Sequence, residues 1–557
     1  MRRIGELMEI LRKKPYPEKL RAIDELKGSQ SPECASVLIN GLYDPDTRVR
    51  KAVSEALISL GAIAFNSLIS GLKTQDRTVR RNILLILEKV NENNPSLANK
   101  TEEILLNCLK DPDPVVKAQA AENLGKMKSK KAIPLLLSLL TDINFWVRSL
   151  AALVLGELGS VADASTWEKV VQSLIERLKD INPWVRRSAG ESLGKLKAKE
   201  AVDKISELAL TDPSDIVQDA MIDALKTIGT ISLPPFQKTL AGPDIKERMK
   251  VMTILTKIGE IALPAILPLL ASEDINLKTI ACSILGQIGS PQAADYLIQL
   301  VSAEKGNIQI LAMNALSQIK EEKVVKYLID LLSHPDPAIS DEAKKSLEKM
   351  GAYAVSFLLP ELNNQNAQVR MKVCEVLGNI GTEKIAYALV KKISDENPWV
   401  RAAVCEALGK IGSKGITPYL IIALKDHSPL VRAKACEALG LLRVPHGIAE
   451  LTARVKDDDL LVKISALKAL TEIKGEDAKP IIIEALKDED FEMRIAAIQA
   501  LGQLEAIETL PLLEKIAQPW PLSRENDAVK EAAQQVIRKF KGVIAYRREK
   551  MRPAGSA

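Results

Sequence analysis

A short sequence pattern recurs along almost the whole chain at intervals of about 31 residues. Its marker is a position that is usually basic and usually follows Val, as in Val49-Arg50 and Val400-Arg401. Most intervals between markers are 30 to 32 residues, and three are longer, at 37, 38 and 36 residues. The marker positions are Arg50, Arg80, Lys117, Arg148, Arg186, Gln218, Arg248, Lys278, Gln309, Ser340, Arg370, Arg401, Arg432, Lys463, Arg494 and Lys530. A fixed period over 557 residues predicts a row of equal units, because a single globular core rarely grows so large.

The residues around each marker have the spacing of an amphipathic helix. Apolar or small residues concentrate one position before the marker and three, six, seven and ten positions after it. The residue seven positions after the marker is Leu in fifteen of sixteen units and Ile537 in the last. Asp, Asn or Ser stands four positions before the marker in fifteen units, and Pro often follows directly. Both features predict a helix start at this turn.

A second, shorter apolar segment precedes each of these helices, for example residues 132–140 and 416–424. Each unit is therefore predicted to be a hairpin of a short helix A, an Asp/Pro turn and a longer helix B. Neither helix can bury its apolar face alone, so each unit must stack on its neighbours. The predicted fold class is all-α: an α-solenoid, a right-handed superhelix of about seventeen hairpins. A degenerate first unit fits at Lys19, 31 residues before Arg50.

Glycine recurs eight positions after the marker, as at Gly156 and Gly409. This position lies inside helix B, where Gly costs about 1 kcal/mol relative to Ala. We therefore expect a neighbouring helix to approach the backbone closely at these glycines.

The repeat Asp-x-x-Val-Arg-x-x-Ala-x-x-Ala-Leu-Gly-x-Ile-Gly resembles the HEAT repeat, and more closely the short HEAT-like repeats of phycobilisome lyases. Residues 397–412 (NPWVRAAVCEALGKIG) are a near-consensus copy, and the resemblance covers residues 17–542. It implies that helix B lines the concave surface and that turn residues and marker arginines form a ladder between neighbouring repeats. The ladder residues so implied are Asp46/Arg50, Asp76/Arg80, Asn144/Arg148, Asn182/Arg186 and Asn397/Arg401. The ladder should fail where the marker is Gln218, Gln309 or Ser340.

Three regions are predicted along the chain. Residues 1–48 are capping helices with the degenerate first repeat, 49–542 are the continuous solenoid, and 543–557 are a basic, disordered tail. The repeat consensus is weakest over 214–345, where we expect a bend or a softer segment. The three long intervals place insertions at 91–101, 160–168 and 518–526. Each is either a tolerated surface loop or a loop on the binding face, and Trp520 could anchor the third on the last unit.

The net charge of +5 is concentrated at the C-terminus. Residues 538–557 hold seven of the 77 basic and one of the 72 acidic residues, which leaves 70 basic and 71 acidic residues in 1–537. This balance of charges argues against nucleic acid as the ligand of residues 1–537, which we call the body, because phosphate binding needs a continuous basic track. The tail alone could contact nucleic acid, an anionic membrane or an acidic partner.

Other sequence signals favour a cytoplasmic protein without a membrane span. No apolar run approaches the roughly 18 residues of a span, and the N-terminus lacks the apolar core of a signal peptide. Six cysteines in 557 residues do not form a disulfide framework.

The sequence contains no recognisable catalytic or metal-binding motif. The three histidines have no second ligand at metal-binding spacing; they are His334, His427 and His446. Four cysteines occupy one repeat position of helix B and are predicted to be structural; they are Cys282, Cys374, Cys405 and Cys436. We therefore expect no cofactor and no metal, and we favour a non-enzymatic role.

Tryptophans are the leading candidates for a binding site. Trp146, Trp184 and Trp399 stand two positions before the marker, and the first two belong to consecutive units. Tryptophan is enriched in interface hot spots, although each of these could instead pack as repeat core. Three favourably ordered charged pairs are also expected on helix B: Glu122–Lys126, Glu191–Lys195 and Glu406–Lys410. A concave face of mixed charge suits a protein or peptide partner.

The sequence thus favours a non-catalytic scaffold that binds a protein or peptide on the concave face. Two alternatives remain open. The resemblance admits a chromophore (bilin) lyase or its partner subunit, and it also admits a nucleic-acid binder similar to the HEAT-like DNA glycosylases. Absorption changes on adding bilin would indicate the first, and affinity that falls steeply with salt would indicate the second.

Overall fold

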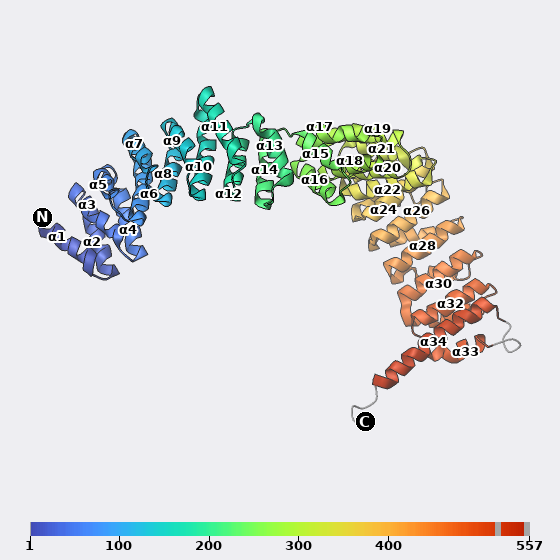
Figure 1. The fold of residues 1–557 in the computed structure, drawn as a ribbon. Coiled ribbons are helices and arrows are strands. Elements are labelled where there is room, and N and C mark those ends of the chain that lie inside the picture. Colours follow the sequence, from blue (N-terminus) through green and yellow to red (C-terminus); the bar gives the residue numbers. More distant parts are fainter. Residues whose placement is uncertain (1, 519–524, 551–557) are drawn as a thin grey trace. The chain divides into compact units, whose positions relative to one another are not determined.

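The computed structural model describes residues 2–518 and 525–550, and within them the chain forms α-helices and short 3-10 segments without any β-strand (Figure 1). In this described part, α1 to α34 alternate between helices A (odd labels) and helices B (even labels), which gives seventeen hairpins. The predicted all-α solenoid is therefore confirmed.

The helix bounds follow the repeat. The A helices are α1 (Arg2–Lys13), α3 (Pro32–Asn40), α5 (Phe65–Gly71), α7 (Ala98–Cys108), α9 (Ile133–Leu139), α11 (Ala164–Arg177), α13 (Val202–Thr211), α15 (Leu233–Leu240), α17 (Leu263–Ile266), α19 (Ala294–Ala303), α21 (Glu322–Asp330), α23 (Ala352–Glu361), α25 (Glu383–Val390), α27 (Thr417–Ala423), α29 (Ile448–Arg454), α31 (Lys479–Ala485) and α33 (Leu510–Ile516). The B helices are α2 (Tyr16–Gly28), α4 (Thr47–Leu60), α6 (Arg77–Asn93), α8 (Pro114–Lys126), α10 (Phe145–Leu158), α12 (Pro183–Lys195), α14 (Asp215–Ile228), α16 (Ile245–Ile258), α18 (Ile275–Ile288), α20 (Asn307–Leu316), α22 (Pro337–Met350), α24 (Ala367–Ile380), α26 (Pro398–Ile411), α28 (Pro429–Leu442), α30 (Leu460–Lys474), α32 (Phe491–Gln503) and α34 (Asp527–Lys550).

Helix α10 shows why these residues form a B helix. The side chain of Asn144 accepts a hydrogen bond from the N–H of Trp146 at 2.9 Å, which caps the first turn. Val147 and Leu155, one position before and seven after the marker, are buried. Their stripe packs α10 against its own α9 and against the neighbouring B helices α8 and α12. Stacking of this kind buries an apolar face that one hairpin would leave in water.

The glycines inside helix B lie where neighbouring helices touch, as predicted. A Cβ added to Gly156 would lie 2.6 Å from the Cβ of Ser192. A Cβ added to Gly409 would lie 2.8 Å from the Cα of Ala438. Real Cβ atoms do not approach other atoms so closely, so any larger residue would force the two helices apart.

The chain divides into two compact units, Met1–Ile280 and Ala281–Ala557. The sequence analysis does not predict this division, although it falls within the segment of weak consensus at 214–345.

The insertions and the tail differ in part from expectation. The first two insertions contribute to the longer A helices α7 and α11 instead of forming only loops. Helix α34 continues to Lys550, so residues 543–550 of the expected disordered tail are helical. Residues 519–524, which include Trp520, and residues 551–557 lie outside the described part of the chain.

Two helical stretches, Thr47–Gly71 and Ile245–Ala271, are long and apolar enough to cross a membrane, contrary to the expectation from sequence. This is weak evidence for a span, because buried core helices have the same composition, and 44% of each apolar window is buried. Each stretch also contains a glycine with positive φ, Gly61 at 55° and Gly259 at 77°, where the B helix ends.

Candidate functional site

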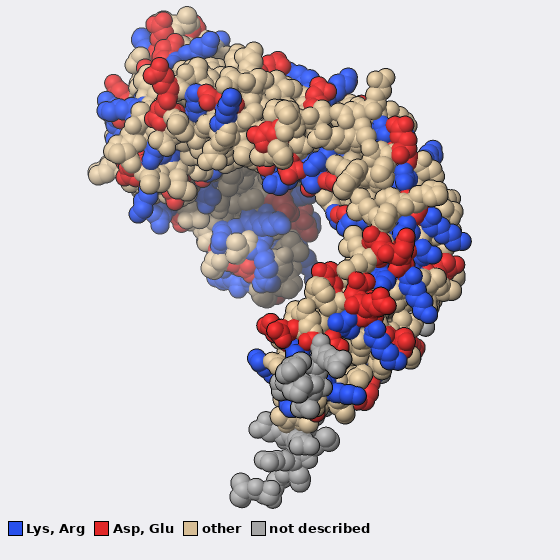
Figure 2. Space-filling view, turned by 90° about the vertical axis from the view of Figure 1, so that its right-hand side faces the viewer, with Lys and Arg blue, Asp and Glu red and all other residues tan. Residues whose placement is uncertain are grey.

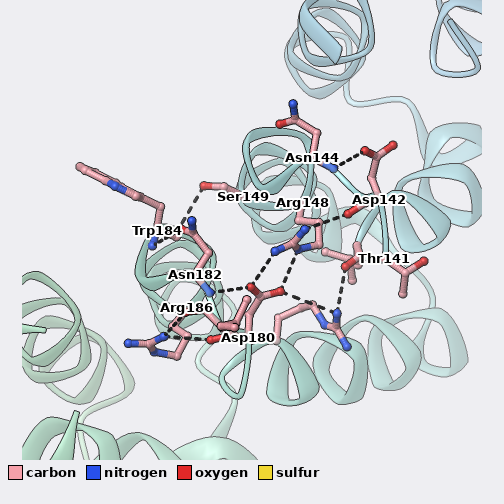
Figure 3. Close-up of polar contacts among 12 residues, drawn as sticks. Thr141, Asp142, Asn144, Arg148, Ser149, Asp180, Asn182, Trp184 and Arg186 are labelled. Atoms are coloured by element: carbon pink, nitrogen blue, oxygen red, sulfur yellow. Dashed lines mark hydrogen bonds and ion pairs between the residues drawn. The ribbon is translucent and has the colours of Figure 1, made fainter. Parts of the chain in front are cut away.

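Marker arginines join consecutive hairpins through buried ion pairs (Figure 3). Arg148 donates from Nε and Nη2 to the carboxylate of Asp180 in the next unit, at 2.8 Å each. It also donates from Nη1 to the carbonyl oxygen of Asp142 in its own turn, at 2.9 Å. The same arrangement repeats one unit later, where Arg186 binds Asp212 at 2.7 and 2.8 Å. Each arginine therefore fastens its own turn and the next one.

The ladder exists, but its acidic members are not those implied by the resemblance. In nine of the ten pairs the partner carboxylate stands six positions before the next marker, and Glu525 stands five positions before Lys530, whereas the implied residues stand four positions before the marker. The observed cross-unit pairs are Lys19–Asp44, Arg80–Asp111, Lys117–Asp142, Arg148–Asp180, Arg186–Asp212, Arg370–Asp395, Arg401–Asp426, Arg432–Asp457, Lys463–Asp488 and Arg494–Glu525.

The implied residues four positions before the marker do not bind the preceding marker because their oxygens cap their own helix. Asn144, Asn182 and Asn397 each accept the N–H two residues ahead, at 2.9 to 3.0 Å. Asp76 likewise accepts from the N–H of Thr78 at 2.8 Å. Asp46 does the same with Arg48, and it also binds the Arg48 guanidinium at 2.7 Å. Asp490 is different: it does not cap its helix, and it binds Lys463 at 3.1 Å beside Asp488.

Arg50 shows what happens when the acidic partner is missing. The residue six positions before the next marker is Thr74, a neutral side chain. Arg50 instead donates to the carbonyl oxygens of Asp44 and Pro45 in its own turn, at 2.7 and 2.9 Å. The implied pair Asp46/Arg50 is therefore wrong: Asp46 binds Arg48, and Arg50 binds backbone carbonyl oxygens.

The predicted failure of the ladder is confirmed at its three positions. Gln218, Gln309 and Ser340 each donate to a backbone carbonyl oxygen six to eight residues earlier in the chain. The residues that replace the acidic partner in this segment are Gly242, Ser272, Ala303, His334 and Asn364. The acidic residue is thus absent at this position between Asp212 and Asp395, whereas the marker remains basic at Arg248 and Lys278. We call this segment the ladder gap. Within this gap the Nε of Arg248 is buried without a hydrogen-bond partner in the described structure.

Five ladder carboxylates have a lowered pKa. Burial alone would raise the pKa of Asp180, but the hydrogen bonds from Arg148 and from the N–H of Asn182 outweigh burial and lower it. The same balance lowers the pKa of Asp142, Asp395 and Asp426. For Asp457, burial is again outweighed by hydrogen bonds, chiefly from Arg432, and the pKa falls to about 2.

Two exposed tryptophans, Trp146 and Trp184, lie in the first turns of consecutive B helices that the ladder joins. Trp146 is 57% exposed and Trp184 is 48% exposed, so the alternative that they pack as repeat core is wrong. Ile143 and Ile181, in the turns just before them, are 100% and 92% exposed. Large exposed apolar side chains that gather on two consecutive turns are characteristic of an interaction surface.

A cavity of about 220 Å³ lies between the exposed faces of α10 and α12. Its lining residues are Trp146, Ser149, Leu150, Leu153, Trp184, Arg187, Ser188 and Glu191. Ser149 and Ser188 share a hydrogen bond of 2.8 Å between the two helices. The Arg187 guanidinium lies 5.5 Å from the centre of the Trp184 ring, where a cation–π contact orients the indole. Sites for whole small molecules take roughly 300–1,000 Å³, so this cavity suits a single side chain.

The apolar surface extends further than the tryptophans. Val115 on α8 and Ile216 on α14 occupy the same repeat position and are also exposed, so four consecutive B helices carry an apolar residue there. We call these four residues the apolar column. A comparison of this one position across all repeats would have predicted the column from the sequence. The tryptophans alone gave two of its four residues and missed Val115 and Ile216.

In the second unit the same position holds Trp399, which is 62% exposed, and Leu461, which is 51% exposed. Leu430 occupies it on α28 and is half-buried. Trp399 is therefore also a surface residue, and its role in binding stays a prediction.

The predicted charged pairs are formed in two of three cases. Glu122 binds Lys126 at 3.0 Å, and Glu406 binds Lys410 at 2.9 Å. The Glu191–Lys195 pair is wrong, because Glu191 accepts from Arg187 at 2.7 Å. Lys195 instead lies 3.6 Å from Glu157 on the preceding B helix. On the face shown in Figure 2, basic and acidic side chains are interspersed.

The four cysteines that share one repeat position of helix B are buried. Burial raises the pKa of Cys374, Cys405 and Cys436 to about 12, so the reactive thiolate is rare at neutral pH. Among the described residues, no three His, Cys, Asp or Glu side chains gather in a group that could hold a metal ion.

Stacked helical hairpins joined by a turn ladder define an α-solenoid of the repeat class. The family model described as HEAT repeats matches residues 4–88, 102–167, 164–226, 355–440, 393–471 and 448–538. These segments cover more than half of the chain, which therefore belongs to the HEAT-repeat family.

Comparison with curated protein sequences gave no match. Among solved structures, the chain is similar to yeast importin-β, Kap95p, at 11% identity and a TM-score of 0.38, covering 98% of this chain and 96% of that one. It is also similar to Kap95 in its complex with Nup1, at 12% identity and a TM-score of 0.42, covering 98% and 96%. A third is the karyopherin Kap121p bound to Ste12p, at 13% identity and a TM-score of 0.39, covering 98% and 69%. Such low scores say nothing about what this chain binds.

Proposed function

We propose that this protein is a non-catalytic scaffold that binds a protein or peptide on the exposed face of its B helices. The observation that carries the proposal is the pair of exposed tryptophans beside a one-residue cavity on α10 and α12. Tryptophan beside arginine in a pocket is the composition of an interface hot spot. The 31-residue period and the near-consensus copy at 397–412 further support membership of the short, phycobilisome-lyase-like subtype.

The two alternatives have less support. A lyase must enclose a tetrapyrrole, and the proposed site does not fit this role because the cavity between the tryptophans is too small for one. A nucleic-acid binder needs a basic track, and the charges of the body are balanced. Only the end of α34 and the residues after it are strongly basic.

Crosslinking mass spectrometry on the protein isolated from its own cells tests the proposal. We expect a stoichiometric protein partner crosslinked near α10 and α12, and we expect its recovery to fall at least tenfold in the Trp146→Ala/Trp184→Ala variant. Tyr296→Ala is the matched control, because Tyr296 is a similarly exposed aromatic residue, at 49%, on an A helix. Equal recovery by the tryptophan variant and wild type would refute the proposed site.

A further inference from the structure

We infer that the B-helix face of the first unit recognises an extended peptide segment that is acidic at one end, apolar in the middle and basic at the other. This inference rests on the proposed function and names the chemistry of the partner. It comes from the order of side chains along consecutive B helices within Met1–Ile280.

The middle of this face is the apolar column. Val115, Trp146, Trp184 and Ile216 lie at equivalent positions in the first turns of α8, α10, α12 and α14. Leu150 and Leu153 widen the column on α10, where the one-residue cavity opens beside them. Exposed apolar area of this kind is costly unless a partner covers it.

One flank of the column is basic. Helices α4 and α6 present four exposed basic side chains; they are Arg48, Lys51, Arg77 and Arg81. Their acidic contacts are loose or local: Arg77 lies 3.6 Å from Asp113, Lys51 lies 4.0 Å from Glu55, and Arg48 binds Asp46. These pairs are largely solvated, so the basic groups can still attract a carboxylate.

The other flank is acidic. Helix α14 presents three exposed carboxylates; they are Asp215, Asp219 and Asp223. Asp219 binds Lys257 of α16 at 2.8 Å, and Asp223 lies 3.4 Å from Lys226. The side chains of Asp219 and Asp223 are nevertheless 62% and 74% exposed, so their outer oxygens face solvent. A continuous nucleic-acid phosphate chain would be repelled at this end, whereas a peptide with a basic end would be attracted.

The spacing of the helices favours an extended occupant. Packed helices lie about 8–10 Å apart, and an extended chain advances about 3.3 Å per residue, so three peptide residues span one step. The four steps from α6 to α14 then take roughly ten to twelve residues, with an apolar residue at every third position. A helical peptide advances about 1.5 Å per residue and would need about five to seven residues per step.

Selection of a random 16-residue peptide library on the full-length protein tests the inference. Enriched peptides should carry an acidic cluster, apolar residues spaced by three, and a basic cluster. With the Asp219→Lys/Asp223→Lys variant as bait, the basic cluster should be replaced by acidic residues. The best wild-type peptide should bind this variant roughly tenfold more weakly, and glutamates at its basic end should restore binding.

Three outcomes would overturn the inference. The first is a set of peptides that needs the tryptophans but is indifferent to the aspartate reversal, and this outcome would leave the proposed function intact. The second is an apolar spacing of about five to seven, which indicates a helical partner. The third is no enrichment, or enrichment that survives Trp146→Ala/Trp184→Ala; the crosslinking experiment then decides independently whether the scaffold proposal also fails.

Discussion

Replacing Asp180 by Ala should destabilise the first unit by about 3 kcal/mol. The Asp180 side chain is 5% exposed and accepts two bonds from Arg148 and one from the N–H of Asn182. Its removal leaves a guanidinium that is itself 12% exposed and has lost its counter-charge. Removing one member of a buried pair costs about 3–5 kcal/mol. We expect the lower end of this range, because Arg148 keeps its bonds to the carbonyls of Asp142 and Ile143.

Amide hydrogen exchange on α10 and α12 is the assay of choice, because a row of repeats need not unfold in two states. Arg148→Met/Asp180→Leu should recover most of the loss, since apolar replacement of a whole buried pair is often neutral. Glu9→Ala is the exposed control; it removes the Lys13–Glu9 pair at 2.9 Å and should leave stability nearly unchanged. A loss below about 1 kcal/mol for Asp180→Ala would refute the reasoning, because it would show that the pair behaves as a solvated one.

Three further predictions follow from the packing and the ladder. Gly409→Ala should cost about 1–3 kcal/mol in urea unfolding because its Cβ would meet Ala438, whereas Gly5→Ala in α1, with open space around it, should stabilise by up to about 1 kcal/mol. The pKa of Asp457 is about 2, below its ordinary value near 4, so its stabilisation is complete above about pH 4. As the pH falls from 4 toward 2, the free energy of unfolding of the wild type should fall by about 2 kcal/mol more than that of Asp457→Asn. Equal losses in the two proteins would contradict the lowered pKa of Asp457. Amides of α14 and α16, beside the ladder gap, should exchange faster than those of α10 and α12, and equal protection would show that the ladder is dispensable.

Much of the fold follows from the sequence because its causes are local. The period, the caps and the apolar stripes each depend on residues within one or two turns of a helix. The close approach at Gly409 was also predictable, since a costly residue repeated inside a helix implies a neighbour that needs the space.

The ladder partners were not predictable from the turn alone. Asp142 and Asn144 are two residues apart and both can accept hydrogen bonds, so the sequence does not say which one caps and which one reaches across. In the structure, the side chain of Asn144 accepts a hydrogen bond from the N–H of Trp146 and so caps the helix, which leaves Asp142 to bind across. The division into two units was likewise not predicted, although the missing ladder partners lie on either side of Ile280.

The turn that builds the ladder also presents the binding residue, and this links stability to recognition. Lys117 holds Asp142 at 2.5 Å, Asp142 accepts the N–H of Asn144, and Asn144 accepts the N–H of Trp146. The chain of bonds from Arg148 through Asp180 and Asn182 to Trp184 repeats this arrangement one unit later. Each exposed tryptophan therefore stands on a backbone that is fixed by an ion pair from the preceding repeat.

The binding surface is therefore ordered before a partner arrives. A partner that binds the apolar column does not need to order these turns, so less conformational entropy is lost on binding. The apolar column ends at α14, and the turn before α14 holds Asp212, the last acidic residue of the first unit at the ladder position.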